Sequence, residues 1–166
     1  GVDGALYQAL EFTGSTIAHL TMDDRFSMCN MAIEAGAKNG IVAVDEITEA
    51  FLADKNLARP AKLHYSDDDA KYVKVLKINV GELEPVIAYP FLPSNGHPLS
   101  KAVSDKIKID QAFIGSCTNG RIEDLRIAAK IIKGKKVAIR TIIVPATPEI
   151  WKQCIDEGIA EIFYDA

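Results

Sequence analysis

Several features are missing from this 166-residue chain, and each absence removes a class of protein. No apolar run is long enough to cross a membrane, and no charged start followed by a hydrophobic stretch predicts a signal peptide. The net charge of −4 leaves no basic field for nucleic acid or anionic lipid, since the lysines and arginines are scattered along the chain. We therefore expect a cytoplasmic protein that binds neither nucleic acid nor a membrane.

Cysteine is also scarce. Cys29, Cys117 and Cys154 are an odd number at wide spacing, without a CxxC pair, so a disulfide framework or a self-contained zinc site is not expected. The chain also lacks the glycine-rich signatures GxGxxG and GxxxxGK[ST], which leaves a nucleotide-binding module as a poorly supported alternative. What remains, with 48% hydrophobic and 25% charged residues, is the composition of a folded globular protein.

The first half of the chain predicts a small α/β domain over residues 1–84. Apolar residues recur at spacings of three and four over residues 15–37, broken near Thr21–Asp24 by a sequence typical of a helix N-cap, which favours two helices in tandem. A buried strand, a second amphipathic helix and a half-buried strand of period two are then expected at 41–44, 45–54 and within 62–82.

The segment 83–98 contains four prolines and an Asn-Gly pair, so we expect no regular structure there and interpret 85–98 as a linker. After it, short β-branched runs alternate with helices of about a dozen residues, which is typical of βαβ units and a parallel sheet covered on both faces. These elements, in a predicted αβα domain over 99–166, are expected at 111–116, 121–132, 137–146 and 147–157. Both chain ends are abrupt, which favours a piece of something longer.

The stretch FIGSCTNGRIEDL places Cys117 where a strand of this sheet ends and a helix begins. Ligands of open parallel sheets gather at such positions, and free N–H groups at the start of the helix would favour a thiolate, which is a nucleophile or a metal ligand. A small buried residue in a tight turn is the structural alternative. A cysteine nucleophile would need a base, and the three histidines lie outside the βαβ half.

A second candidate lies in the stretch MCNMAIEAGAKNG. Asn30 and Glu34 are four residues apart on the predicted helix and would project from one face. Small, uncharged neighbours would allow these two side chains to line a cleft. The alternative is that they belong to the solvated side of an amphipathic helix.

Taken together, IGSCTNGRIEDLR (114–126) and CNMAIEAGAKNGIV (29–42), supported by INVGELEP and IIVPATPE, resemble the aconitase superfamily. The resemblance follows the chain in order along almost its whole length. It is strongest to the large subunits of the branch that acts on 2-isopropylmalate, with homoaconitate as the alternative substrate.

The resemblance implies an aconitase-type αβα iron–sulfur domain and a [4Fe–4S] cluster held by three cysteines, with one iron open to substrate. Cys117 would be the first cluster ligand, Asn30 would lie beside the cluster sulfurs, and Glu34 would lie near the substrate hydroxyl. The implied enzyme is a hydro-lyase that isomerises 2-isopropylmalate to 3-isopropylmalate in leucine biosynthesis, with a separate small subunit as partner. A scaffold that kept the fold without the chemistry is the remaining alternative.

The chain departs from the family pattern in its cysteines. The family's other two cluster ligands form a CxxC pair beyond Ala166, and neither Cys29 nor Cys154 matches them. One thiolate cannot hold a cluster that needs several. We therefore expect these 166 residues alone to lack the cluster and to be inactive.

Overall fold

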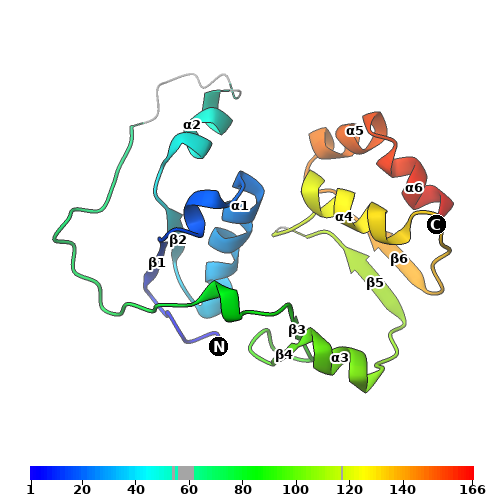
Figure 1. The fold of residues 1–166 in the computed structure, drawn as a ribbon, viewed down its shortest axis with the longest axis horizontal. Coiled ribbons are helices and arrows are strands. Elements are labelled where there is room, and N and C mark those ends of the chain that lie inside the picture. Colours follow the sequence, from blue (N-terminus) through cyan, green and yellow to red (C-terminus); the bar gives the residue numbers. More distant parts are fainter. Residues whose placement is uncertain (54, 56–61, 117) are drawn as a thin grey trace. The chain divides into compact units, whose positions relative to one another are not determined.

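The computed structural model describes residues 1–53, 55, 62–116 and 118–166, which form two compact units, Gly1–Asp105 and Lys106–Ala166. Each unit is described below by itself (Figure 1). Over the described residues, no helix combines the length and apolar character that a bilayer crossing needs. The domain limits at residues 84 and 99 stay a prediction.

The first unit is built on two parallel strands, β1 (Ala9–Phe12) and β2 (Asn39–Val42), paired from Ala9 with Asn39 to Phe12 with Val42. The connection between them is helical and contains a 3₁₀ turn, an α-helix and a second 3₁₀ turn, which are η1 (Ile17–His19), α1 (Met22–Met31) and η2 (Ala32–Ala35). Helix α2 (Glu46–Ala53) follows β2. The predicted order of helices and strand is confirmed here, but the first of the two tandem helices is only the short turn η1, and β2 is not buried as predicted.

The start of α1 confirms the predicted N-cap. The Thr21 hydroxyl accepts a hydrogen bond from the Asp24 backbone N–H at 3.2 Å, and the Asp24 carboxylate accepts one from the Thr21 N–H at 3.2 Å. This reciprocal pair satisfies donors that have no partner within the helix. The helical region ends at Gly36, whose φ of +82° is the left-handed conformation that glycine adopts without strain.

Small residues let α1 and η2 lie directly against β2. A Cβ on Gly40 would be 2.7 Å from the Cα and 2.8 Å from the carbonyl oxygen of Cys29, so only glycine fits between strand and helix. The buried apolar cluster beside this contact consists of Ala5, Ala32 and Ala37. The first unit is therefore held by close backbone approach more than by large apolar side chains.

The strand expected within 62–82 is not formed, and that prediction was wrong. Residues 71–79 form no helix or strand in the described part of the chain, and Val73 is 89% exposed. The hydroxyls of Ser66 and Tyr72 donate to the Glu11 carboxylate at 2.9 and 2.5 Å, which attaches this segment to β1. Period-two alternation marks two faces, but a strand also needs a neighbour to complete its backbone hydrogen bonds.

The expectation of no regular structure in 83–98 was also wrong in part. After η3 (Val80–Glu82), strands β3 (Val86–Ala88) and β4 (Gly96–Pro98) pair antiparallel, and α3 (Leu99–Asp105) follows directly. The prolines are compatible with this pair because Pro85 precedes β3, while Pro98 ends β4 in a sheet of only two strands. A proline at such a position removes no necessary ladder donor.

The second unit has the predicted βαβ order. Strands β5 (Gln111–Ile114) and β6 (Arg140–Ile143) pair in parallel, with α4 (Ile122–Ile132) between them and α5 (Pro148–Asp156) and α6 (Ile159–Asp165) after them. Together with the parallel pair in the first unit, this confirms the α/β class.

The core of the second unit lies between its helices and one face of its sheet (Figure 1). Leu125 of α4 and Cys154 of α5 are fully buried, and Ile114 and Ile143, neighbours in the strand register, pack against them. Phe113 points to the opposite face and is 57% exposed. Among the described residues of this unit, two of the three predicted αβα layers are present.

Candidate functional site

In the loop after β5, the described residues 115, 116 and 118–121 lie close to the chain that leaves β6. Gly115 has a φ of +112°, and a Cβ there would lie 2.0 Å from the carbonyl oxygen of Val144. Hydrogen bonds fix both ends of the loop, because the Val144 N–H donates to Ile114 at 2.8 Å and the Ala146 N–H donates to Gly120 at 2.9 Å. The loop therefore lies at the carboxyl ends of two parallel strands, where such folds bind their ligands.

Cys117, the predicted cluster ligand in this loop, lies outside the described residues. Its sequence neighbours form a compact turn. The Ser116 hydroxyl accepts hydrogen bonds from the backbone N–H groups of Thr118 at 3.1 Å and Asn119 at 3.0 Å, while the Ser116 N–H donates to the Asn119 carbonyl at 2.9 Å. The role of Cys117 stays a prediction.

Asp124, in the first turn of α4, connects the other side of the loop to the helix. One carboxylate oxygen accepts hydrogen bonds from the backbone N–H groups of Gly120 and Arg121, both at 3.0 Å. The other oxygen accepts one from the Asn119 side-chain amide at 3.2 Å. We overlooked Asp124 in the sequence, where an acid three residues after the N-cap position was the available signal.

These hydrogen bonds engage some of the N–H groups that the sequence argument took as free. Free N–H groups at the start of α4 were expected to favour a thiolate at Cys117. The N–H groups of Gly120 and Arg121 instead donate to Asp124, which also places a negative charge at the positive end of the helix. The N–H groups of Thr118 and Asn119 donate to Ser116.

Asn30 and Glu34 belong to the first unit, and both are exposed. They do not lie on one α-helix as predicted, because α1 ends at Met31 and Glu34 lies in the 3₁₀ turn η2. The chain changes from an α-helix to a 3₁₀ turn here because the left-handed Gly36 ends the helical region within two residues of Glu34. Both side chains are accessible to a ligand, and their catalytic roles stay a prediction.

The other two thiols are poor candidates for cluster ligands. Burial raises the pKa of Cys154, which is fully enclosed in the core of the second unit. Burial also raises the pKa of Cys29, although a hydrogen bond from the Val42 backbone opposes this effect. Over the described residues, no group of three histidine, cysteine, aspartate or glutamate side chains is placed to hold a metal ion.

A charged pair that we also overlooked in the sequence holds the first unit together. Arg25 is 2% exposed, and its guanidinium donates to both carboxylate oxygens of Asp45, at 2.5 and 2.6 Å. It also donates to the Thr48 hydroxyl at 3.0 Å and to the Ile17 carbonyl at 3.1 Å. The hydrogen bonds from Arg25 hold the pKa of Asp45 well below its usual range. This pair joins α1 to the start of α2.

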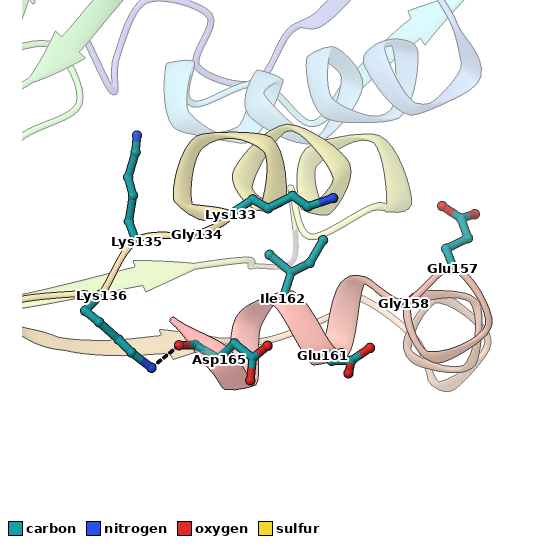
Figure 2. Close-up of a pocket in the computed structure, with 9 residues that line it drawn as sticks. All are labelled: Lys133, Gly134, Lys135, Lys136, Glu157, Gly158, Glu161, Ile162 and Asp165. Atoms are coloured by element: carbon teal, nitrogen blue, oxygen red, sulfur yellow. Dashed lines mark hydrogen bonds between the residues drawn. The ribbon is translucent and has the colours of Figure 1, made fainter.

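A pocket of about 620 Å³ lies in the second unit between the chain that follows α4 and helix α6 (Figure 2). Its lining mixes three lysines with three acids, so it has no field of one sign, and the Lys136 ammonium donates to the Asp165 backbone carbonyl. The pocket adjoins the C-terminal end of α4, whereas the loop 115–121 adjoins the N-terminal end. None of the predicted site residues that the structure describes lines it. The lining residues are Lys133, Gly134, Lys135, Lys136, Glu157, Gly158, Glu161, Ile162 and Asp165.

The fold and the loop define an α/β protein with a tightly bound turn at the carboxyl ends of parallel strands. The model of the aconitase family (aconitate hydratase) matches residues 1–166, and the chain belongs to this family. It is 66% identical to the 3-isopropylmalate dehydratase large subunit of Sulfurimonas denitrificans, 64% to that of Nitratiruptor sp. and 66% to that of Campylobacter concisus. Each match covers 100% of this chain and 40% of the relative, so the chain spans about 40% of the length of these relatives.

Proposed function

We propose that this chain is part of the large subunit of a [4Fe–4S] hydro-lyase that isomerises 2-isopropylmalate to 3-isopropylmalate by dehydration and rehydration. The observation that carries the proposal is the match of the entire chain, at 61–66% identity, to eight relatives named 3-isopropylmalate dehydratase large subunit. The proposal includes a small subunit as partner, a cytoplasmic location and a place in leucine biosynthesis.

The cluster would be held by thiolates from more than this chain. Cys117 is the one cysteine of this chain at a position that the resemblance assigns to a cluster ligand, so the remaining ligands would come from the other 60% of the length of the relatives. When bound, such a cluster supplies a Lewis-acidic iron that helps a hydroxyl group leave. The described residues by themselves provide no donor set for such a cluster.

The chain's own polar residues have separate roles in this proposal. Glu34, with an exposed carboxylate, would exchange a proton with the substrate hydroxyl or with water. Asn30, also exposed, would donate its side-chain amide toward a cluster sulfur and so orient the cluster.

The test uses the full-length large subunit assembled with its small subunit and loaded with iron and sulfide. We expect turnover of 2-isopropylmalate and, for Glu34→Gln, a fall in kcat of about 10²–10⁴-fold, because general acid–base groups contribute rate factors of that size. Glu49→Gln is the matched control, since it removes an exposed glutamate of α2 in the same unit.

Three results would change the proposal. Turnover of homoaconitate in preference to 2-isopropylmalate would identify homoaconitate as the substrate. A loaded complex that turns over neither acid would favour the scaffold. Equal effects of Glu34→Gln and Glu49→Gln would remove the catalytic role of Glu34 while leaving the reaction in place.

A further inference from the structure

The segment 73–79 of the first unit exposes an unusual density of apolar side chains. Every residue from 62 to 88 is exposed, and residues 62–79 form no helix or strand (Figure 1). Within this stretch, four neighbouring apolar side chains are 68–89% exposed, which are Val73, Val75, Leu76 and Ile78. Apolar side chains gathered in this way are typical of a surface that a partner covers.

Both ends of the segment are anchored within the first unit. Before it, the Tyr72 hydroxyl donates to the Glu11 carboxylate of β1 at 2.5 Å. At its other end, the Asn79 side-chain carbonyl accepts a hydrogen bond from the Gly81 N–H at 3.2 Å. The residues between these two anchors have no strand partner in the part of the chain that the structure describes. The segment is therefore held at two points while its middle is open to a partner.

The alternation of the side chains indicates which kind of partner fits. In an extended strand, one face would carry Lys74 with Leu76 and Ile78, and the other would carry Lys77 with two valines. Each face thus combines two apolar side chains with one ammonium group. A helix or a lipid surface would cover one face only, whereas a neighbouring strand places side chains beside both faces. The pattern favours a strand as the partner.

Charge decides what this strand carries. The stretch 70–81 contains three lysines and no acid. Opposite charges stabilise facing strands and like charges destabilise them. A second copy would place lysine opposite lysine in parallel pairing in register, and again in antiparallel pairing centred on Lys74. A strand that alternates acidic with apolar side chains would instead match both faces.

We propose that residues 73–79 pair with such an acidic and apolar strand from a part of the longer large subunit outside residues 1–166. This chain spans about 40% of the length of its relatives, and a strand in the same polypeptide is present at a high effective concentration. The inference rests on the proposed function, because the partner belongs to the longer subunit. It adds an interface that joins this region to the remainder of the subunit.

Photo-crosslinking in the full-length large subunit assembled with its small subunit identifies the partner. Benzoylphenylalanine replaces Leu76, and mass spectrometry identifies the crosslinked peptide. We expect an intramolecular crosslink to a peptide outside residues 1–166 that contains aspartate or glutamate. The control places benzoylphenylalanine at Val103 of α3, which is also 68% exposed, and should not capture that peptide. A crosslink from Leu76 to the small subunit, to a second copy or within residues 1–166 would overturn the proposal, as would capture of the same peptide from both positions.

Hydrogen exchange in the wild-type complex tests the pairing without any substitution. Alternate amides of 73–79 should exchange about 10²-fold or more slowly than those of the exposed turn 67–69, because paired amides exchange only when the strand opens. Equal rates in the two stretches, in a complex that turns over 2-isopropylmalate, would overturn the pairing and leave the proposed function. Slow exchange in a complex that turns over neither acid would support the pairing and overturn the proposed activity.

Reversing the charge of the segment tests the acidic character of the partner. In the variant that combines Lys74→Glu with Lys77→Glu, attraction between the strands becomes repulsion. We expect the amides of 73–79 to exchange about 3–30-fold faster than in wild type. Lys62→Glu, which reverses an exposed lysine of the same unit outside the segment, should leave these rates within twofold of wild type. Equal effects of the two changes would overturn the acidic partner.

Discussion

The two units of this chain are stabilised in different ways. The second unit, Lys106–Ala166, buries large side chains such as Leu125 between three helices and a parallel sheet. The first unit, Gly1–Asp105, buries only alanines in its apolar cluster and relies on a buried arginine and on a glycine that lets helix and strand touch. The comparison shows that one family fold can combine a conventional apolar core with a region held by polar contacts and close backbone packing.

The largest effect is expected from opening the apolar core of the second unit. Leu125→Ala should lower the free energy of unfolding by about 2–5 kcal/mol, because it leaves a cavity at a fully buried position. Trp151, the single tryptophan, lies in α5 of this unit and reports its unfolding by fluorescence in urea. The control is Ile127→Ala on the same helix, where the side chain is 58% exposed and the change should be about 0.5 kcal/mol or less. Equal effects at both positions would contradict the assigned core.

In the first unit, the largest effect should come from the buried charge. Asp45→Ala leaves the guanidinium of Arg25 buried without its carboxylate, and we expect a loss of about 2–3 kcal/mol. Arg25→Met should cost less, about 1–2 kcal/mol, because the Asp45 side chain is 36% exposed and water can replace its partner. Hydrogen exchange of the α1 and β2 amides measures the loss of stability in each variant. A larger loss of stability in Arg25→Met than in Asp45→Ala would contradict the assignment of Arg25 as the buried charge that depends on its partner.

Close packing in the first unit makes Gly40 sensitive to a single methyl group. Gly40→Ala should destabilise this unit by about 1–3 kcal/mol, since the new Cβ would meet the backbone of Cys29 and push α1 away from β2. Gly81→Ala is the control, because its nearest neighbour would lie at an ordinary 3.4 Å. Chemical denaturation followed by circular dichroism compares the two variants. An unchanged denaturation midpoint for Gly40→Ala would show that α1 can move away from β2 without loss of stability.

The Arg25–Asp45 pair should make the first unit lose stability at acid pH more readily than the second unit. The folded pKa of Asp45 is depressed, so its stabilisation is fully present above the unfolded value of about 3.9 and is lost as pH falls through the lower folded pKa. Below about pH 4, amides of α1 should therefore lose protection in wild type more steeply than in Asp45→Asn. Parallel curves for the two proteins would rule out Asp45 as the source.

The smallest effect is expected at the surface of the second unit. Arg126 on α4 and Glu157 at the end of α5 form an ion pair at 2.5 Å, with 42% and 31% of their side chains exposed. Glu157→Gln should change the free energy of unfolding by only about 0.2–1 kcal/mol, less at high salt. Repeating the Trp151 fluorescence measurement at low and high ionic strength provides the check. A loss comparable with that of Leu125→Ala would mean that this unit also depends on a polar contact.

Local sequence signals predicted most of the second unit. Helices α4 and α5 and strands β5 and β6 were expected within a few residues of their observed bounds, because each is marked by its own periodicity or by a cap such as Thr147, whereas α6 was not predicted. The N-cap at Thr21 was predictable for the same reason. By contrast, alternation in 71–80 indicated a strand for which the described chain offers no partner, and local composition carries no information about where a partner lies.

The candidate site was predictable only where its chemistry is local. Cys117 and its turn stand out in the sequence, but the Arg25–Asp45 pair joins residues 20 apart, and nothing in either stretch indicates the other. Asp124 was missed because an acid near a helix start is usually explained by capping alone. Its contact with Asn119 depends on how the loop folds back, which is set by the packing of Gly115 against Val144.

The exposed segment from Lys71 to Val80 has no strand partner in the described part of the chain and exposes valine, leucine and isoleucine side chains, a composition that favours pairing between copies. Lys71, Lys74 and Lys77 interrupt it at every third residue. Two copies that stacked in register would bring like charges together at each repeat, and this repulsion would oppose such stacking. Neutralising them by acetylation would remove that protection without altering any contact within the folded units.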